Sequence, residues 1–210
     1  MRSADWYFDF ISPYAYLQNA VLGRFADKLA IVRRPVVFAG LLDHWGQLGP
    51  AEIKPKRRFI YRHCAHQAAR LGIPYALPPR HPFNPLGALR LAVALGATPP
   101  AVDAIFAWIW GQGREADTPE GIAELARQLG VGDVAARIAA PDVKAELRAN
   151  GERAIAAGVF GVPTLAIDGE IFWGYDATDM ALDYLADPAG FAAGEMGRAN
   201  DLPVGAERRR

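Results

Sequence analysis

The first residue that could do chemistry is Ser12, in the stretch FDFISPYAYL over residues 8–17. Pro13 pushes the residue before it toward extended backbone, which is also the backbone state of a helix N-cap, so Ser12 is suited to start a helix. A helix N-terminus also stabilises an anion such as a thiolate, because it gathers unpaired N–H groups and a positive dipole. No G-x-S-x-G turn surrounds Ser12, so a hydrolytic nucleophile is disfavoured. The stretch leaves two interpretations open, a simple cap and a cap that also holds an anion.

The second candidate is GVFGVPTL, residues 158–165. An ordinary trans proline that precedes a strand is the simpler interpretation. If the bond before Pro163 is cis, Val162 presents its backbone N–H and C=O to a ligand. An extended peptide could then pair with Val162 as an added strand.

Three further stretches carry weaker signals. HCAH (63–66) places two histidines one helical turn apart, but zinc needs further ligands and Cys64 lies on another helical face, so surface histidines are favoured and no metal site is predicted. KPKRR (54–58) is typical of a solvated basic face, with a contact to a ligand carboxylate as the alternative. In HPFNPLGALRLA (81–92), Asn84 either caps the following helix or the segment forms the wall of a pocket.

Composition limits the class of partner. The chain has 210 residues, of which 51% are hydrophobic, and its 23 basic residues balance 23 acidic ones. This balance disfavours nucleic acid and anionic membranes and favours a small molecule. The start of the chain lacks the apolar core of a signal peptide and no apolar run is long enough to cross a bilayer, so a cytoplasmic location is expected. A single cysteine, Cys64, excludes an internal dithiol pair.

The elements that must position these residues begin with a βαβ unit. WYFDFI (6–11) predicts a buried strand, and apolar residues at helical spacing predict a helix from Pro13 to about Leu29. IVRRPVVFAG (31–40) predicts a second strand, in which Pro35 marks an edge or a bulge. Strand, helix and strand in this order predict a parallel pair.

Residues 41–135 change in character and predict helices only. Within them, Thr118 is a good N-cap for a helix that starts at Pro119 and ends at Gly130. This region is therefore interpreted as a helical insertion.

The C-terminal part returns to mixed structure. A helix is expected over 141–158, and Asp168-Gly169 between two short apolar runs predicts a type I′ hairpin. A last helix is expected over 176–187, and GAERRR is expected to be a frayed tail.

Two distant segments point to one family. FDFISPYAYL and GVFGVPTLAIDGEIFWGYD resemble the signatures of 2-hydroxychromene-2-carboxylate isomerases, which are relatives of kappa-class glutathione transferases within the DsbA-like thioredoxin superfamily, and HPFNPLGALRLA is similar to a mid-chain motif of that family. The resemblance implies an α/β, thioredoxin-like fold with an all-helical domain inserted after the second strand. The corresponding domains are 1–40 with 136–190, an insertion over 41–135, and a C-terminal tail over 191–210.

The resemblance also implies roles for individual residues. Ser12 matches the active serine of the family and would hydrogen-bond the thiolate of bound glutathione. The other positions that would contact glutathione are Lys56, Ile53, Val162, a cis Pro163, Trp173, Gly174, Tyr175 and Asp176. Weaker matches to a substrate pocket are His81 and Asn84.

The resulting prediction is a glutathione-dependent isomerase that acts on a 2-hydroxychromene-2-carboxylate-like intermediate of aromatic catabolism, with glutathione as cofactor. The resemblance implies a homodimer. The alternatives are a kappa-like glutathione transferase or peroxidase and a non-catalytic thiol-ligand binding module of the same fold. A dithiol oxidase is disfavoured because one cysteine cannot cycle a disulfide.

Overall fold

A four-stranded mixed sheet organises the molecule in the computed structural model, which describes residues 1–206. The spatial order is β2-β1-β3-β4; β1 runs parallel to β2 and antiparallel to β3, which is antiparallel to β4. The strands are β1 (Arg2–Phe8), β2 (Leu29–Pro35), β3 (Thr164–Ile167) and β4 (Glu170–Trp173). The predicted parallel pair is confirmed, and β2 is an edge strand that ends at Pro35.

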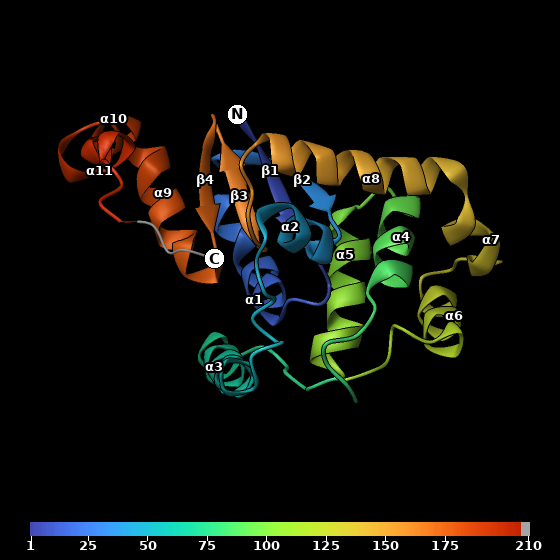
Figure 1. The fold of residues 1–210 in the computed structure, drawn as a ribbon. Coiled ribbons are helices and arrows are strands. Elements are labelled where there is room, and N and C mark those ends of the chain that lie inside the picture. Colours follow the sequence, from blue (N-terminus) through green and yellow to red (C-terminus); the bar gives the residue numbers. More distant parts are fainter. Residues whose placement is uncertain (207–210) are drawn as a thin grey trace.

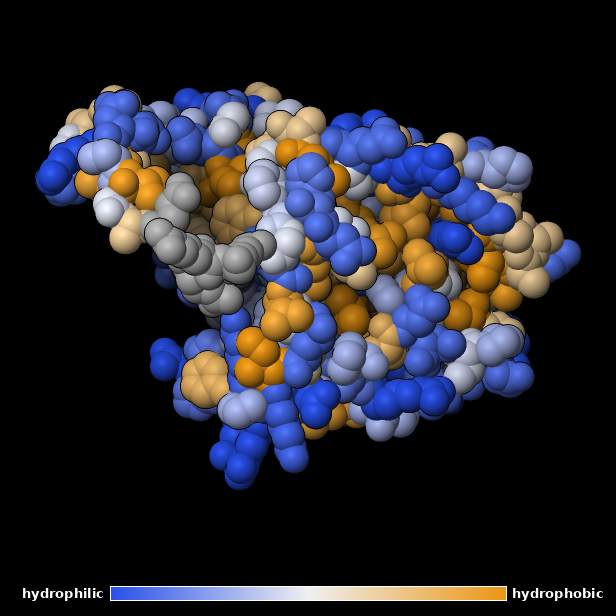
Figure 2. Space-filling model, viewed as in Figure 1, coloured by the Kyte–Doolittle hydropathy of each residue, from blue (hydrophilic) through white to orange (hydrophobic). Residues whose placement is uncertain are grey.

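Helices surround the sheet and fill the long central part of the chain. Helix α9 lies beside β4 and helix α4 beside β2, at opposite ends of the sheet (Figure 1). The helices are α1 (Pro13–Val21), α2 (Phe38–Trp45), α3 (Lys54–Leu71), α4 (Leu86–Ala94), α5 (Pro99–Phe106), α6 (Pro119–Gln128), α7 (Val134–Ala139), α8 (Pro141–Ala156), α9 (Thr178–Ala186), α10 (Pro188–Phe191) and α11 (Gly194–Arg198). Helix α8 presents hydrophilic residues along one rim, and apolar surface shows between it and the helices below (Figure 2).

One hydrophobic core joins the sheet to the central helices. Trp6 and Phe8 of β1 stack at 4.4 Å between ring centroids, and the Phe8 ring lies 5.6 Å from that of Phe106 on α5. The same buried cluster continues through Leu89 of α4 and Leu125 of α6. Residues 41–135 are helical or irregular, as predicted, but they share this core with the sheet.

Several predicted boundaries are wrong at the N-terminal end. The first strand spans Arg2–Phe8 rather than 6–11, because Asp9 already turns the chain by accepting a hydrogen bond from the Ile11 amide. The first helix stops at Val21 and is followed by a 3-10 turn, so β2 starts at Leu29.

The second strand also ends earlier than predicted. It stops at Pro35, and Phe38 begins α2, because the Asp9 carboxylate accepts the Phe38 amide at 2.9 Å and so stabilises the start of that helix.

Other local predictions hold. Thr118 caps α6 through the Gly121 amide, and Asp168 and Gly169 both have positive φ, at 53° and 92°, as the predicted hairpin turn requires. Helices α8 and α9 lie within the expected ranges 141–158 and 176–187. Residues 191–201, expected to be tail, contain α11 and a short 3-10 turn, whereas the predicted frayed end GAERRR lies largely outside the described residues.

Candidate functional site

The centre of the candidate site is the contact between Ser12 and Val162. Ser12 has extended backbone (φ −90°, ψ 114°) and caps α1, and its Oγ accepts a hydrogen bond from the Ala15 amide at 3.3 Å. The same hydroxyl donates to the carbonyl oxygen of Val162 at 3.4 Å. Both bonds are long for hydroxyl contacts, so the hydroxyl can turn toward a stronger acceptor at small cost.

The loop that holds Val162 precedes β3, and its Val162-Pro163 bond is cis. Within residues 1–206, the Val162 amide donates to no other residue, whereas Thr164 begins the pairing with β1. The indole N–H of Trp45 on α2 donates to the carbonyl of Val159 at 3.0 Å and fixes the start of the loop. Val162 therefore offers an unpaired backbone N–H beside Ser12.

A second loop, Gly174–Asp176, is tied to the first. The Gly174 amide donates to the Pro163 carbonyl at 2.8 Å. Gly174 has φ 97°, and a Cβ there would collide with the Asp176 carboxylate, so glycine is required at this close turn. The Trp173 ring lies directly against Gly161, where a side chain would clash with its indole nitrogen. The turn places the Asp176 side chain in solvent, and within residues 1–206 it forms no ion pair.

Gln18 connects α1 to this second loop. Its fully buried side chain accepts from the Trp6 indole at 2.7 Å and donates to the Gly174 carbonyl at 2.9 Å and to the Thr178 hydroxyl at 3.3 Å. Sequence reasoning missed Gln18. Its signal was a polar residue next to the apolar positions Leu17 and Val21 of the predicted helix.

The segment just before Ser12 is held by side chains of the central helices. Trp110, in a five-residue π-helical turn (Ala107–Gly111) after α5, donates to the Phe10 carbonyl at 2.8 Å. His81 Nε2 donates to the Ile11 carbonyl at 2.8 Å, which leaves Nδ1 to accept from the Tyr61 hydroxyl at 2.7 Å. Burial lowers the pKa of His81, and its ring is neutral at neutral pH.

Asp9 lies beneath the same turn and was not singled out by sequence reasoning. Its carboxylate is buried and accepts the amides of Ile11 and Phe38. Burial raises the pKa of Asp9 to about 7, against the lowering effect of these amides. A charged residue between two aromatics in FDF was the signal that could have indicated it.

Tyr14 stands one residue beyond Pro13 and contacts α3. Its hydroxyl lies 2.9 Å from His63 Nδ1. Burial, with smaller effects of Cys64 and Asp176, raises the pKa of Tyr14 to about 12. Burial likewise raises the pKa of the Cys64 thiol to about 12, so this thiol stays protonated and is not a nucleophile.

The remaining candidates form no hydrogen bond with Ser12 within residues 1–206. Asn84 is exposed and accepts the Leu86 amide at 3.1 Å, so it forms a turn just before α4, whose cap position is Pro85. Lys56 and Ile53 are exposed at the start of α3, and within residues 1–206 no hydrogen bond joins them to Ser12. His63 contacts Tyr14 rather than lying free on the surface, and no group of three or more possible metal ligands gathers in the described part of the chain.

Most of the chain matches a known domain. The sequence pattern of the DSBA-like thioredoxin domain fits residues 4–186. The chain belongs to this family. The expected thioredoxin-like fold is thus confirmed.

Individual relatives narrow the comparison. The chain is 28% identical over 193 residues to a 2-hydroxychromene-2-carboxylate isomerase of Sphingobium xenophagum, covering 89% of this chain and 99% of the relative. It is 29% identical over 209 residues to glutathione S-transferase kappa 2 of Caenorhabditis elegans, covering 89% and 93%. A solved 2-hydroxychromene-2-carboxylate isomerase superposes with a TM-score of 0.75 at 24% identity, over 91% of this chain and all (100%) of that one. The similar proteins are therefore isomerases and glutathione transferases. No helix within residues 1–206 is long and apolar enough to cross a bilayer.

Proposed function

We propose that the protein is a glutathione-dependent isomerase that acts on a 2-hydroxychromene-2-carboxylate-like substrate. The observation that carries the proposal is the convergence of three features from distant parts of the chain: the Ser12 cap, the unpaired Val162 amide and the Gly174–Asp176 turn. The names of the similar proteins support the same chemistry. A cytoplasmic location and a homodimer remain part of this proposal.

The residues of the site fit glutathione. The Val162 amide and carbonyl suit the backbone of a cysteinyl residue, which an extended peptide would present as an added strand. The unpaired Asp176 carboxylate suits an α-ammonium group, because it can both neutralise it and accept its hydrogen bonds. Lys56 and Ile53, at the exposed start of α3, and the Trp173 and Tyr175 side chains would complete the contacts around the ligand.

When bound, glutathione supplies a thiolate that adds reversibly to an electron-poor carbon of the substrate. Ser12 would turn its hydroxyl from Val162 toward that sulfur and stabilise its charge. The N-terminus of α1 would add its dipole to the same effect, already in place before binding. Asp9 accepts the Ile11 amide and His81 donates to the Ile11 carbonyl, and both residues would thereby hold the Phe10–Ser12 turn in position.

The proposal is tested by following bound glutathione and product together. The protein is titrated with glutathione by calorimetry, then incubated with glutathione and 2-hydroxychromene-2-carboxylate while the substrate spectrum and the concentration of free thiol are recorded. An isomerase converts the substrate without loss of thiol. Conversion with stoichiometric loss of thiol would instead support a kappa-like transferase, and binding without conversion of this or other electrophiles would support a non-catalytic module.

A further inference from the structure

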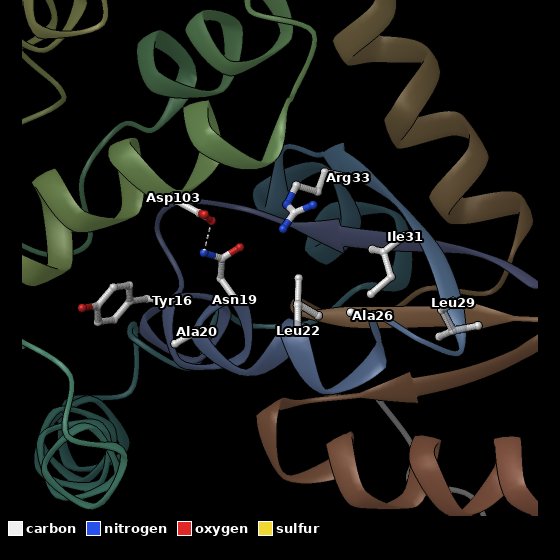
Figure 3. A pocket seen from close by; sticks show the side chains of 10 residues that line it. Tyr16, Asn19, Ala20, Leu22, Ala26, Leu29, Ile31, Arg33 and Asp103 are labelled. Atoms are coloured by element: carbon white, nitrogen blue, oxygen red, sulfur yellow. Dashed lines mark hydrogen bonds between the residues drawn. The ribbon is translucent and has the colours of Figure 1, made fainter. Parts of the chain in front are cut away.

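A pocket opens beside the C-terminal half of α1, on residues other than those around Ser12. It has a volume of about 570 Å³ and lies between α1, the turn after it, β2 and α5 (Figure 3). A pocket of this size holds a small molecule. The lining residues are Tyr16, Asn19, Ala20, Leu22, Gly23, Ala26, Leu29, Ile31, Arg33 and Asp103.

One end of this pocket is polar and carries both signs of charge. Arg33 comes from β2, Asn19 from α1 and Asp103 from α5, and their side chains face one another across the hollow (Figure 3). The Asn19 amide group donates to Asp103 at 2.7 Å. Asn19 therefore holds the Asp103 carboxylate at the edge of the pocket.

Two buried polar atoms at this end lack partners. Arg33 Nε and Asn19 Oδ1 are shielded from solvent and form no hydrogen bond within residues 1–206. Buried polar atoms are nearly always paired. Because these two atoms are shielded, a ligand in the pocket meets the outer guanidinium nitrogens of Arg33, which form no hydrogen bond within residues 1–206, and the exposed Asp103 carboxylate. A ligand that pairs with both groups must carry an anionic acceptor and a cationic donor close together.

The other end of the pocket is apolar. It is formed by Leu22, Ala26, Leu29 and Ile31, which carry no hydrogen-bonding side chains. A ligand that reaches from the polar end to this surface needs an aliphatic group of a few carbons.

We propose that this pocket binds a free α-amino acid with a branched aliphatic side chain. Its carboxylate pairs with the outer guanidinium nitrogens of Arg33, its ammonium with the Asp103 carboxylate that Asn19 holds in place, and its side chain lies on Leu22 and Ile31. The charges of the site sum to zero, as do those of the zwitterion. A simple anion fits worse, because it would meet the Asp103 carboxylate.

The test is calorimetric titration of the full protein with L-leucine and with three analogues that each lack one feature: 4-methylpentanoate without the ammonium, isopentylamine without the carboxylate, and glycine without the side chain. Leucine is expected to bind, and each analogue about tenfold or more weakly, since each loses a charged or apolar contact. Leucine should bind equally well with saturating glutathione present, because the pocket is separate from Ser12. Failure of leucine to bind, equal binding of any analogue, or competition by glutathione would overturn the proposal.

Variants assign the binding to this pocket. Arg33→Gln and Asp103→Asn are each expected to weaken leucine binding about tenfold. Lys28→Gln removes the same unit charge as Arg33→Gln at an exposed position outside the pocket and should leave binding unchanged. Asp103 is exposed, so Asp103→Asn keeps the test valid if Arg33→Gln does not fold. Unchanged leucine binding in Asp103→Asn would refute the proposed site.

Discussion

Ser12 Oγ and the carbonyl oxygen of Val162 lie 3.4 Å apart although 150 positions separate them in the chain. The hydroxyl thus joins the first helix to the loop before β3. Because its other contact, with the Ala15 amide, is the cap of α1, a single oxygen serves both the start of a helix and the edge of the proposed binding surface.

Ser12→Ala should lower turnover by about a hundredfold while changing glutathione affinity little, because in the proposed mechanism the hydroxyl would stabilise charge on sulfur and would not hold the peptide backbone of the ligand. The absorbance of thiolate against pH in the bound state should shift to higher pH. The cap loss should also cost about 1 kcal/mol of unfolding free energy. Ser3→Ala, at an exposed serine of β1, is the matched control. Identical thiolate titrations in both variants would mean that Ser12 does not stabilise the thiolate.

Asp176→Asn should weaken glutathione binding about tenfold, because an ammonium would lose a charged partner. Desamino-glutathione, which lacks that ammonium, should bind the variant and the original protein alike. Asp183→Asn, an exposed acid of α9, should change neither affinity. Calorimetric titration with both ligands checks this prediction. Equal losses of affinity for the two ligands would mean that Asp176 does not contact the ammonium group of glutathione.

Gln18→Met should lower the unfolding free energy by about 1–3 kcal/mol, since it leaves the Trp6 indole and the Gly174 carbonyl buried without partners. The substitution should also weaken the binding of glutathione more than that of desamino-glutathione, because losing Gln18 loosens the Gly174–Asp176 turn that positions the Asp176 carboxylate. Gln67→Met, which removes only a contact with His63, is the control. Denaturant unfolding and calorimetry separate the two effects; a stability loss with no ligand discrimination would mean that Gln18 has a structural role only.

Asp9 should make the protein lose stability as pH rises from about 4 to 7. Its pKa is raised to about 7 in the folded state, whereas it is about 4 when unfolded, so the folded protein prefers the proton. Below pH 4 the group is protonated in both states. Across this window the original protein should lose roughly 2–4 kcal/mol relative to Asp9→Asn. Urea unfolding of both proteins at several pH values measures the difference, and equal pH dependence in the two would refute the prediction.

His81 should change stability with pH in the opposite direction to Asp9. Because burial lowers its pKa, its contribution to stability is complete above about pH 6.5 and is lost as pH falls below that value. His81→Phe should abolish this acid sensitivity and slow turnover, since the Ile11 carbonyl loses its donor. His66→Phe, on the exposed face of α3, provides the comparison. Unfolding at pH 5 and 7 with turnover at pH 7 tests both effects, and an unchanged turnover would mean that His81 does not position Ser12.

Local sequence signals were sufficient where one short segment determines the structure. Ser12 before Pro13 predicts a cap, and Asp168-Gly169 predicts a hairpin turn, because each depends on the backbone preferences of adjacent residues. The order of strand and helix then determines the parallel pair. The resemblance brought Ser12 together with Val162, which no local rule could do.

What the sequence could not provide depends on distant partners. The early end of the second strand depends on the Asp9 carboxylate, and the roles of Gln18 and His81 depend on carbonyl groups far along the chain. Helix and strand propensities contain no information on such contacts. For the same reason, the sequence did not predict the pocket beside α1, whose polar end combines Asn19, Arg33 and Asp103 from three elements.

The shared aromatic core also decides how ligands can enter and leave. Phe8 of the sheet and Phe106 of the central helices pack together in one buried cluster. Swinging the central helices away from the sheet would bring these rings into water at a cost of about 1.5–3 kcal/mol each, which is a large part of the usual stability of a folded domain. If the proposed ligand binds at Ser12, its exchange is therefore expected to depend on side chains and short turns at the surface, and not on a movement of the central helices away from the sheet.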